Sequence, residues 1–236
     1  MNRQAQGVVL LLLGGAVLKA SLTDMYLRYV KAGLQPFLIA AGVVLVAAAV
    51  MTLIHDLRGR ADTHDGHDHG TGGPKVGWLL ILPVLGLLLV APPALGSYAA
   101  GQSGTALTSQ SISDYPPLPP GDPAQISLLE YASRAVFDNG ASLDGRSVQM
   151  TGFVIKGEGT ELILARIILS CCAADGRPIK IGMTGDAPHD LAADTWVEVT
   201  GRYSTQHGTD PVNGEQIPYL DVESWTRIDP PKNQYQ

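Results

Sequence analysis

Residues 148–154, VQMTGFV, and residues 197–203, VEVTGRY, share one pattern: apolar residues alternate with others and a Thr-Gly pair follows. Such alternation is typical of a β-strand with one buried face. A glycine inside a strand often marks a sharp bend or a bulge. The two segments therefore predict bent strands.

Three more segments are strand-like, because they are β-branched or alternating and are separated by Gly, Asp and Pro. The five expected strands are residues 147–155, 161–170, 178–183, 195–203 and 217–227. Five short strands with bends at glycine fit a small Greek-key barrel of the OB type, whereas a sandwich usually needs more strands. We therefore expect a soluble OB-like β-barrel in residues 123–236, a length that can bury its own core.

One amphipathic helix is expected at the start of this domain. Asp122 provides a capping side chain and Pro123 suits the first helical position. Asn139-Gly140 is a helix stop. Between these signals, apolar residues recur at steps of three or four, at Ile126, Leu129, Ala132 and Val136.

Residues 97–122 are rich in Gly, Ser, Thr and Pro, and they end in DYPPLPPGD at residues 114–122. Proline fixes φ and removes a backbone donor. A chain of this composition is typical of an extended, semi-rigid spacer. We expect it to link the barrel to residues 1–96.

Residues 1–96 are predicted to be a membrane anchor. About twenty apolar residues cover a hydrocarbon core of about 30 Å. Lys19 is tolerable in the first span if its ammonium reaches the interface; a cleaved signal peptide is the alternative there, although Lys19 and Asp24 fit a cleavage region poorly. The expected transmembrane helices are residues 7–27, 34–54 and 76–95.

Charge is distributed unevenly along the 236 residues, of which 45% are hydrophobic and only 16% charged. The first hundred residues have a net charge of +2 and the rest −8. An acidic soluble half makes nucleic acid an unexpected partner, since phosphate binding needs a basic surface. The segment between Gly96 and Arg134 has no Lys or Arg, which favours an extracytoplasmic position. We expect a multi-pass protein of the bacterial plasma membrane with its C-terminal domain outside.

A histidine-rich loop, residues 62–70, joins the second and third expected spans. His64, His67 and His69 are interleaved with aspartates in it. Imidazole is the commonest metal ligand and suits zinc, copper and nickel, although this spacing matches no fixed zinc motif. The loop is therefore a candidate metal site, and a solvated turn is the alternative.

The two cysteines are adjacent, Cys171-Cys172, in ILSCCAADGRP at the end of the second expected strand. One interpretation is two small, inert, buried residues. A second is a soft metal site with Asp175, His189 or His207 as further ligands. A third is a strained vicinal disulfide outside the cell.

The sequence lacks a phosphate-binding glycine loop, a nucleophile elbow and a paired zinc motif. We therefore expect a binding protein rather than an enzyme.

The chain resembles the bacterial YcgQ-like membrane proteins, described as permease subunits with a C-terminal domain of unknown function. The resemblance covers most of the chain: YVKAGLQPF at residues 29–37, the His-rich loop, and TGFVI, ARIILSCCAADGRPI and DTWVEVTG further on. It implies a multi-span permease as partner and a role in metal homeostasis, chiefly of zinc. It also implies that Cys171, Cys172 and Asp175 are the signature positions.

The expected function is therefore an accessory subunit of a bacterial membrane permease, with zinc as the expected metal. Its partners would be a multi-span permease and the lipid bilayer. An extracytoplasmic thiol-disulfide protein and an inert anchored interaction module are the alternatives.

Overall fold

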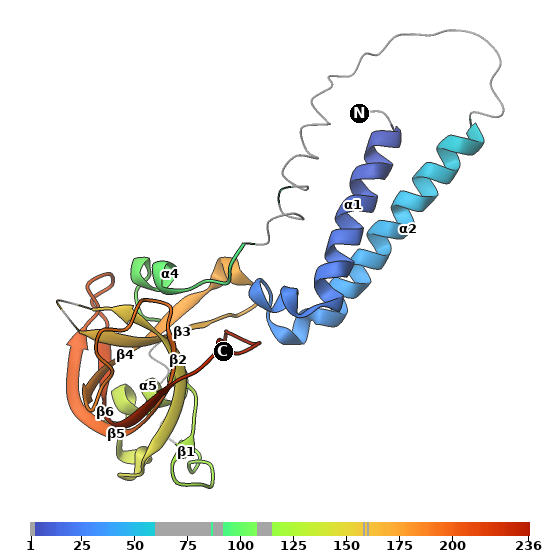
Figure 1. The fold of residues 1–236 in the computed structure, drawn as a ribbon. Coiled ribbons are helices and arrows are strands. Elements are labelled where there is room, and N and C mark those ends of the chain that lie inside the picture. The colour runs from blue at the N-terminus through green and yellow to red at the C-terminus, as the bar shows by residue number, and fades with distance from the viewer. Residues whose placement is uncertain (1–2, 60–85, 87–91, 108–114, 158, 160) are drawn as a thin grey trace. The chain divides into compact units, whose positions relative to one another are not determined.

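The structure is a computed structural model that describes residues 3–59, 86, 92–107, 115–157, 159 and 161–236. The chain divides into two compact units, Met1–Pro93 and Ala94–Gln236. Figure 1 shows the elements of each. The His-rich loop, with His64, His67 and His69, lies outside the described residues.

Two antiparallel helices, α1 (Arg3–Leu22) and α2 (Gln35–Gly59), form a hairpin in the N-terminal unit (Figure 1). Glycines let their backbones approach closely. A Cβ atom at Gly14 would lie 2.9 Å from Cγ2 of Val46, and one at Gly42 would lie 2.7 Å from Cγ of Leu18. Larger side chains at these positions would push the helices apart.

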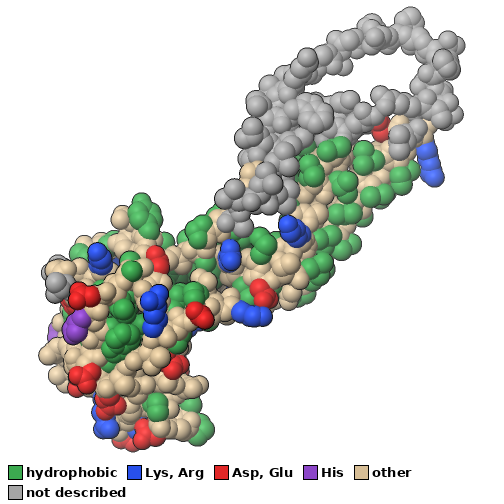
Figure 2. Space-filling model, viewed as in Figure 1, with side chains coloured by type: hydrophobic (Ala, Val, Ile, Leu, Met, Phe, Trp, Pro, Cys, Tyr) green, Lys and Arg blue, Asp and Glu red, His purple; other side chains and the backbone are tan. Residues whose placement is uncertain are grey.

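The outer surface of this hairpin is apolar. Figure 2 shows hydrophobic side chains along the face of the hairpin that is in view. Within the described residues, Ala32–Asp56 is long and apolar enough to cross a membrane, and Gln6–Leu22 is apolar but shorter. The exposed large hydrophobic residues include Leu11, Leu13, Leu22, Phe37, Val43, Val44, Val50, Met51 and Ile54.

The first predicted span differs from the structure at its end. Helix α1 stops at Leu22 and not at Leu27, because Thr23 adopts an extended conformation (φ −117°, ψ 163°) and a 3₁₀ turn, Asp24–Arg28, follows. The second span is confirmed as a helix, α2. Most of the third, residues 76–85 and 87–91, lies outside the described residues.

Five strands close into a β-barrel in the C-terminal unit, so the prediction of a small barrel is confirmed (Figure 1). Around the barrel the order is β2-β3-β4-β6-β5 and back to β2. The β4–β6 pair is parallel and the other barrel pairs are antiparallel. The strands are β2 (Val148–Lys156), β3 (Leu162–Ile168), β4 (Arg177–Gly185), β5 (Trp196–Thr209) and β6 (Gln216–Arg227).

The two Thr-Gly segments are neighbours that close the barrel. They pair antiparallel from Val148 opposite Gly201 to Phe153 opposite Trp196. The register of β5 against β6 shifts between Thr200 and Gly201. The bend predicted from the glycine is therefore present in β5, and it lets the strand turn around the barrel.

The amphipathic helix, α5 (Leu128–Phe137), starts later than the sequence signal at Asp122. Its cap is Ser127, whose side chain accepts a hydrogen bond from the Glu130 N–H at 3.0 Å. The preceding residues form β1 (Ala124–Gln125), which pairs with β2 and keeps the chain extended. The predicted stop is confirmed, because Gly140 is left-handed (φ 74°) and its N–H bonds to the Arg134 carbonyl at 3.0 Å.

The expected spacer is partly folded onto the barrel. A short helix, α4 (Ser97–Gln102), buries Ala100 completely, and the Thr105 N–H donates to Asp210 at 2.8 Å. Further along, the Tyr115 hydroxyl donates to the Ser133 carbonyl of α5 at 3.0 Å. Residues 97–107 and the segment from Tyr115 are thus part of the C-terminal unit, whereas residues 108–114 lie outside the described part of the chain.

Candidate functional site

The cysteine pair lies on the connection between β3 and β4. Strand β3 ends at Ile168, and a single 3₁₀ turn, η5 (Ala173–Asp175), leads into β4 at Arg177. Both cysteines are free thiols; Cys171 is exposed and Cys172 is half-buried. The prediction that they follow the second strand is confirmed. The interpretation of two buried residues is wrong, because Cys171 is exposed and Cys172 is only half-buried.

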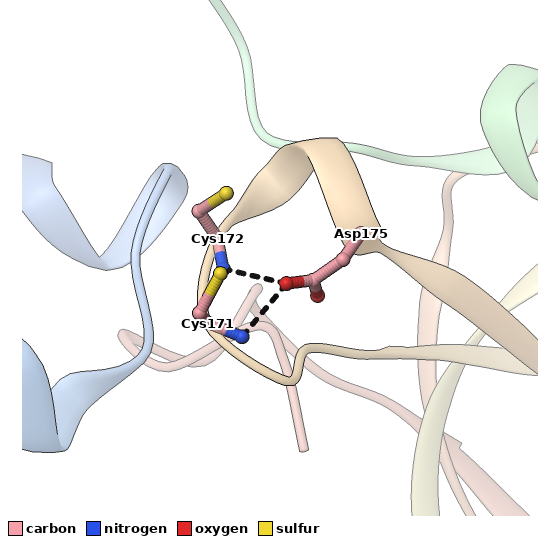
Figure 3. A group of neighbouring side chains, drawn as sticks. All are labelled: Cys171, Cys172 and Asp175. Carbon is pink, nitrogen blue, oxygen red and sulfur yellow. Dashed lines mark hydrogen bonds between the residues drawn. The ribbon is translucent and has the colours of Figure 1, made fainter.

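Asp175 organises this turn. Its Oδ1 accepts the Ser170 N–H at 2.7 Å, and its Oδ2 accepts the N–H groups of Cys171 and Cys172 at 2.8 and 3.1 Å. In return, the Cys172 side chain accepts a hydrogen bond from the Asp175 backbone N–H, which completes a capping box. Figure 3 shows the Asp175 carboxylate turned toward the two cysteine amides. Three consecutive amides are therefore fixed by one carboxylate.

The same carboxylate changes the acidity of the site. A hydrogen bond with the Cys171 thiol, followed by those from the backbone amides, holds the pKa of Asp175 far below its usual range. Conversely, the hydrogen bond to Asp175, a hydrogen bond with Cys172 and the nearby negative charge raise the pKa of Cys171 to about 11. At neutral pH Cys171 is thus a protonated thiol.

The three side chains form a compact donor set. One ligand atom from each of Cys171, Cys172 and Asp175 lies within 4.8 Å of the others. Zinc binds thiolate sulfur at about 2.3 Å and carboxylate oxygen at about 2.0–2.2 Å, so donors around one zinc ion are less than about 4.6 Å apart. The spacing therefore fits a single ion after a small adjustment, once the thiol protons have left.

The other candidate ligands are placed differently. Although His189 and His207 both lie among the described residues, neither belongs to this donor set. His64, His67 and His69 lie outside the described residues, so their metal role stays a prediction. Within the described residues, the donor set supplies three atoms, and a tetrahedral ion needs a fourth from water or from another protein.

Sequence reasoning missed a buried ion pair in the barrel. Lys180 Nζ lies 2.9 Å from Asp210 Oδ2, and the two side chains are 4% and 0% exposed. The signal was present in the strand PIKIGM, residues 178–183, where a lysine interrupts an apolar run. Its partner could not be found, because Asp210 is thirty positions away at the end of another strand.

Comparison with known families gives a match in the C-terminal part of the chain. The model of the DUF1980 C-terminal domain matches residues 131–236. This match spans the barrel, the cysteine turn and α5 from Tyr131 on, and it supports a C-terminal domain of unknown function. No curated protein matches the chain.

Proposed function

We propose that the chain is a membrane-anchored accessory subunit of a bacterial permease, and that its OB-like barrel binds a metal ion, chiefly zinc, at Cys171 and Cys172. The observation that carries this proposal is the donor set on the exposed turn, where two thiols and one carboxylate converge. The apolar helical hairpin and the resemblance to permease subunits support the rest.

The two sulfur atoms are the principal ligands in this proposal. Asp175 already accepts three backbone hydrogen bonds, so it contributes at most one further lone pair to an ion. Its main task is to hold both cysteines on one turn. A bound zinc ion would provide positive charge that stabilises both thiolates and would release their protons.

An ion held by so few ligands is easily passed on. The turn is exposed, and no other His, Cys, Asp or Glu of the described residues completes the donor set. Structural zinc sites, in contrast, have four protein ligands. We therefore propose that the permease supplies the remaining ligands when the ion is transferred.

The hairpin anchors the chain by crossing the membrane twice. Helix α2 is long enough to span, and α1 packs against it with no room for a side chain at Gly14. Two helices in such contact share one environment, and their outward side chains are apolar. With a third span at residues 76–95, the barrel would lie outside the cell.

The alternative functions have less support. A catalytic thiol of a disulfide-exchange enzyme has a lowered pKa, whereas that of Cys171 is raised to about 11. An inert module would keep its cysteines buried, whereas Cys171 is exposed.

Copurification tests the partner. The tagged full chain, extracted in a mild detergent after crosslinking in intact cells, should recover one multi-span transport protein in near-stoichiometric amount. A Gly14→Leu chain, whose hairpin is disturbed, is the matched control and should recover less of it. Recovery of no multi-span protein in several mild detergents would contradict the proposal.

Labelling tests the orientation separately. A membrane-impermeant maleimide applied to intact cells should modify Cys171, and Cys171→Ser should remove the exposed site. Modification only after the cells are permeabilised would place the barrel in the cytoplasm and contradict this part of the proposal.

A further inference from the structure

A pocket of about 410 Å³ lies at one end of the barrel, and no residue of the cysteine turn lines it. It is lined where β2 runs into β3, around Lys156 and Glu161, and where β5 runs into β6, around Thr209 and Ile217. A volume of this size is typical of sites for small molecules. The pocket combines apolar walls with five polar side chains, those of Lys156, Glu161, Lys180, Thr209 and Tyr219, which is the composition of a binding site.

The first polar group is Lys180, whose ammonium is buried. It pairs with Asp210 at 2.9 Å. Asp210 is already occupied, because its oxygens also accept the N–H groups of Thr105 at 2.8 Å and Val212 at 2.9 Å. An ammonium has three donors, and within the described residues the Lys180 ammonium has this one partner. Since buried donors without acceptors are costly, a ligand oxygen in the pocket would complete the site.

The second polar group is the pair of Glu161 and Tyr219. The Tyr219 hydroxyl donates to Oε1 of Glu161 at 2.5 Å. The ring of Tyr219 lies against the backbone of Gly182 and Gly208, which limits its movement. A Cβ atom added at Gly208 would lie 3.3 Å from Cε2 of Tyr219, and one added at Gly182 would lie closer to the ring still. This arrangement fixes Oε1 and leaves Oε2 of Glu161 as an acceptor for a cation.

Opposite charges therefore face one pocket. Lys156 and Lys180 provide positive charge, Glu161 provides negative charge, and Ile155 and Ile217 provide apolar walls. A polyanion such as a nucleotide would be repelled by Glu161 and by Asp210 behind Lys180. A molecule with only one charged end would leave one polar side of the pocket unmatched.

We propose that this pocket binds a small zwitterion, with its carboxylate at Lys180 and Lys156, its ammonium at Glu161, and its carbon skeleton against Ile155 and Ile217. The proposal is independent of the metal site, because none of these residues belongs to the cysteine turn.

Isothermal titration of the full chain in detergent tests the charge pattern. The probes are leucine and 6-aminohexanoate, which carry both charges at different separations, and hexanoate and hexylamine, which carry one each. At least one zwitterion should saturate below about 10 mM and bind at least about tenfold more tightly than either single-charge probe. Absence of saturable binding by both zwitterions, or equal affinity for hexanoate, would overturn the proposal.

Substitutions at the exposed Lys156 and the half-buried Glu161 locate the ligand without disturbing the buried ion pair of Lys180. Glu161→Gln should weaken the zwitterion about tenfold while hexanoate binds at least as tightly as before, because a like charge is removed. Lys156→Gln should weaken both probes. Glu215→Gln and Arg177→Gln, at exposed positions outside the pocket lining, are the matched controls and should change neither. Unchanged zwitterion binding in both Glu161→Gln and Lys156→Gln would refute the site.

Discussion

Cys172 and Asp175 cap each other across one turn: the Cys172 N–H donates to Asp175 Oδ2 at 3.1 Å, and the Cys172 side chain accepts from the Asp175 N–H. The carboxylate that fixes this cap also bonds the N–H of Cys171. One side chain therefore sets the position of both thiols and the acidity of the exposed one, and a change at Asp175 should be visible in both properties.

Asp175→Asn should make Cys171 more reactive. Removing the negative charge lowers the pKa of the thiol from about 11, so more thiolate is present at pH 8. The measurement is the rate of alkylation by iodoacetamide as a function of pH, read residue by residue by mass spectrometry. The pH of half-maximal rate should fall. Asp229→Asn, a change at an exposed position elsewhere, is the control and should leave the pH dependence of the rate unchanged. An unchanged pH dependence in Asp175→Asn would show that this carboxylate does not control the acidity of the thiol.

Adjacent glycines of α1 test the helical hairpin. Gly14→Leu should destabilise it, because a Cβ there would meet Val46 at 2.9 Å, whereas Gly15→Leu should be tolerated, because no atom lies within 4 Å of its Cβ position. Overpacking of this kind costs about 1–3 kcal/mol. The thermal midpoint of the full chain in detergent provides the comparison. Equal midpoints for both variants would contradict the packing.

Lys180→Met should destabilise the barrel strongly. It leaves the carboxylate of Asp210 buried without its counter-charge, and breaking a buried pair costs about 3–5 kcal/mol. Adding Asp210→Asn should recover part of the loss, since the uncompensated charge is then absent and one acceptor oxygen remains for the backbone N–H groups that bond to this side chain. Chemical unfolding, followed by the fluorescence of Trp196 and Trp225, measures the free energy of unfolding of the single and the double variant. A Lys180→Met chain as stable as wild type would show that the pair is not buried in solution.

The stability of the barrel should also fall in acid. Burial opposes ionisation of Asp210, but hydrogen bonds from Lys180, Val212 and Thr105 outweigh it and lower the pKa of this carboxyl. A lowered folded-state pKa contributes stability above the unfolded value of about 3.9, and this contribution is lost as the pH falls through the folded value. Asp210→Asn should therefore flatten the decline below about pH 4, measured by unfolding at a series of pH values. If the stability of Asp210→Asn falls as steeply in acid as that of wild type, other groups cause the loss.

Local patterns predicted the barrel and its strands because the decisive signals are short in range. The alternation and the glycine of residues 197–203 specify a bent strand wherever its partner lies. The predicted start of α5 was wrong because a long-range contact overrides the local signal. Asp122-Pro123 has the right local chemistry, but the Ala124 N–H bonds to the Ser147 carbonyl at 2.9 Å, and this pairing with a distant segment keeps the chain extended.

The candidate site was partly predictable for the same reason. Cys171, Cys172 and Asp175 are within five residues, so one turn brings them together. Lys180 and Asp210 meet only because β4 and the end of β5 lie on one barrel, and spacing in the sequence does not reveal that contact. Composition likewise indicated a spacer at residues 97–122, and only the fold shows that Thr105 within it bonds to the same buried carboxylate.

Zinc titration of the full chain in detergent, competed against a chromophoric chelator, tests the central proposal most directly. Wild type should bind one zinc ion per chain, with an affinity that rises with pH because the thiol protons must leave. Cys171→Ser/Cys172→Ser should lose this binding, while His207→Asn, outside the donor set, should retain it. Equal binding by wild type and the double variant, or no binding by wild type at pH 8, would contradict the account.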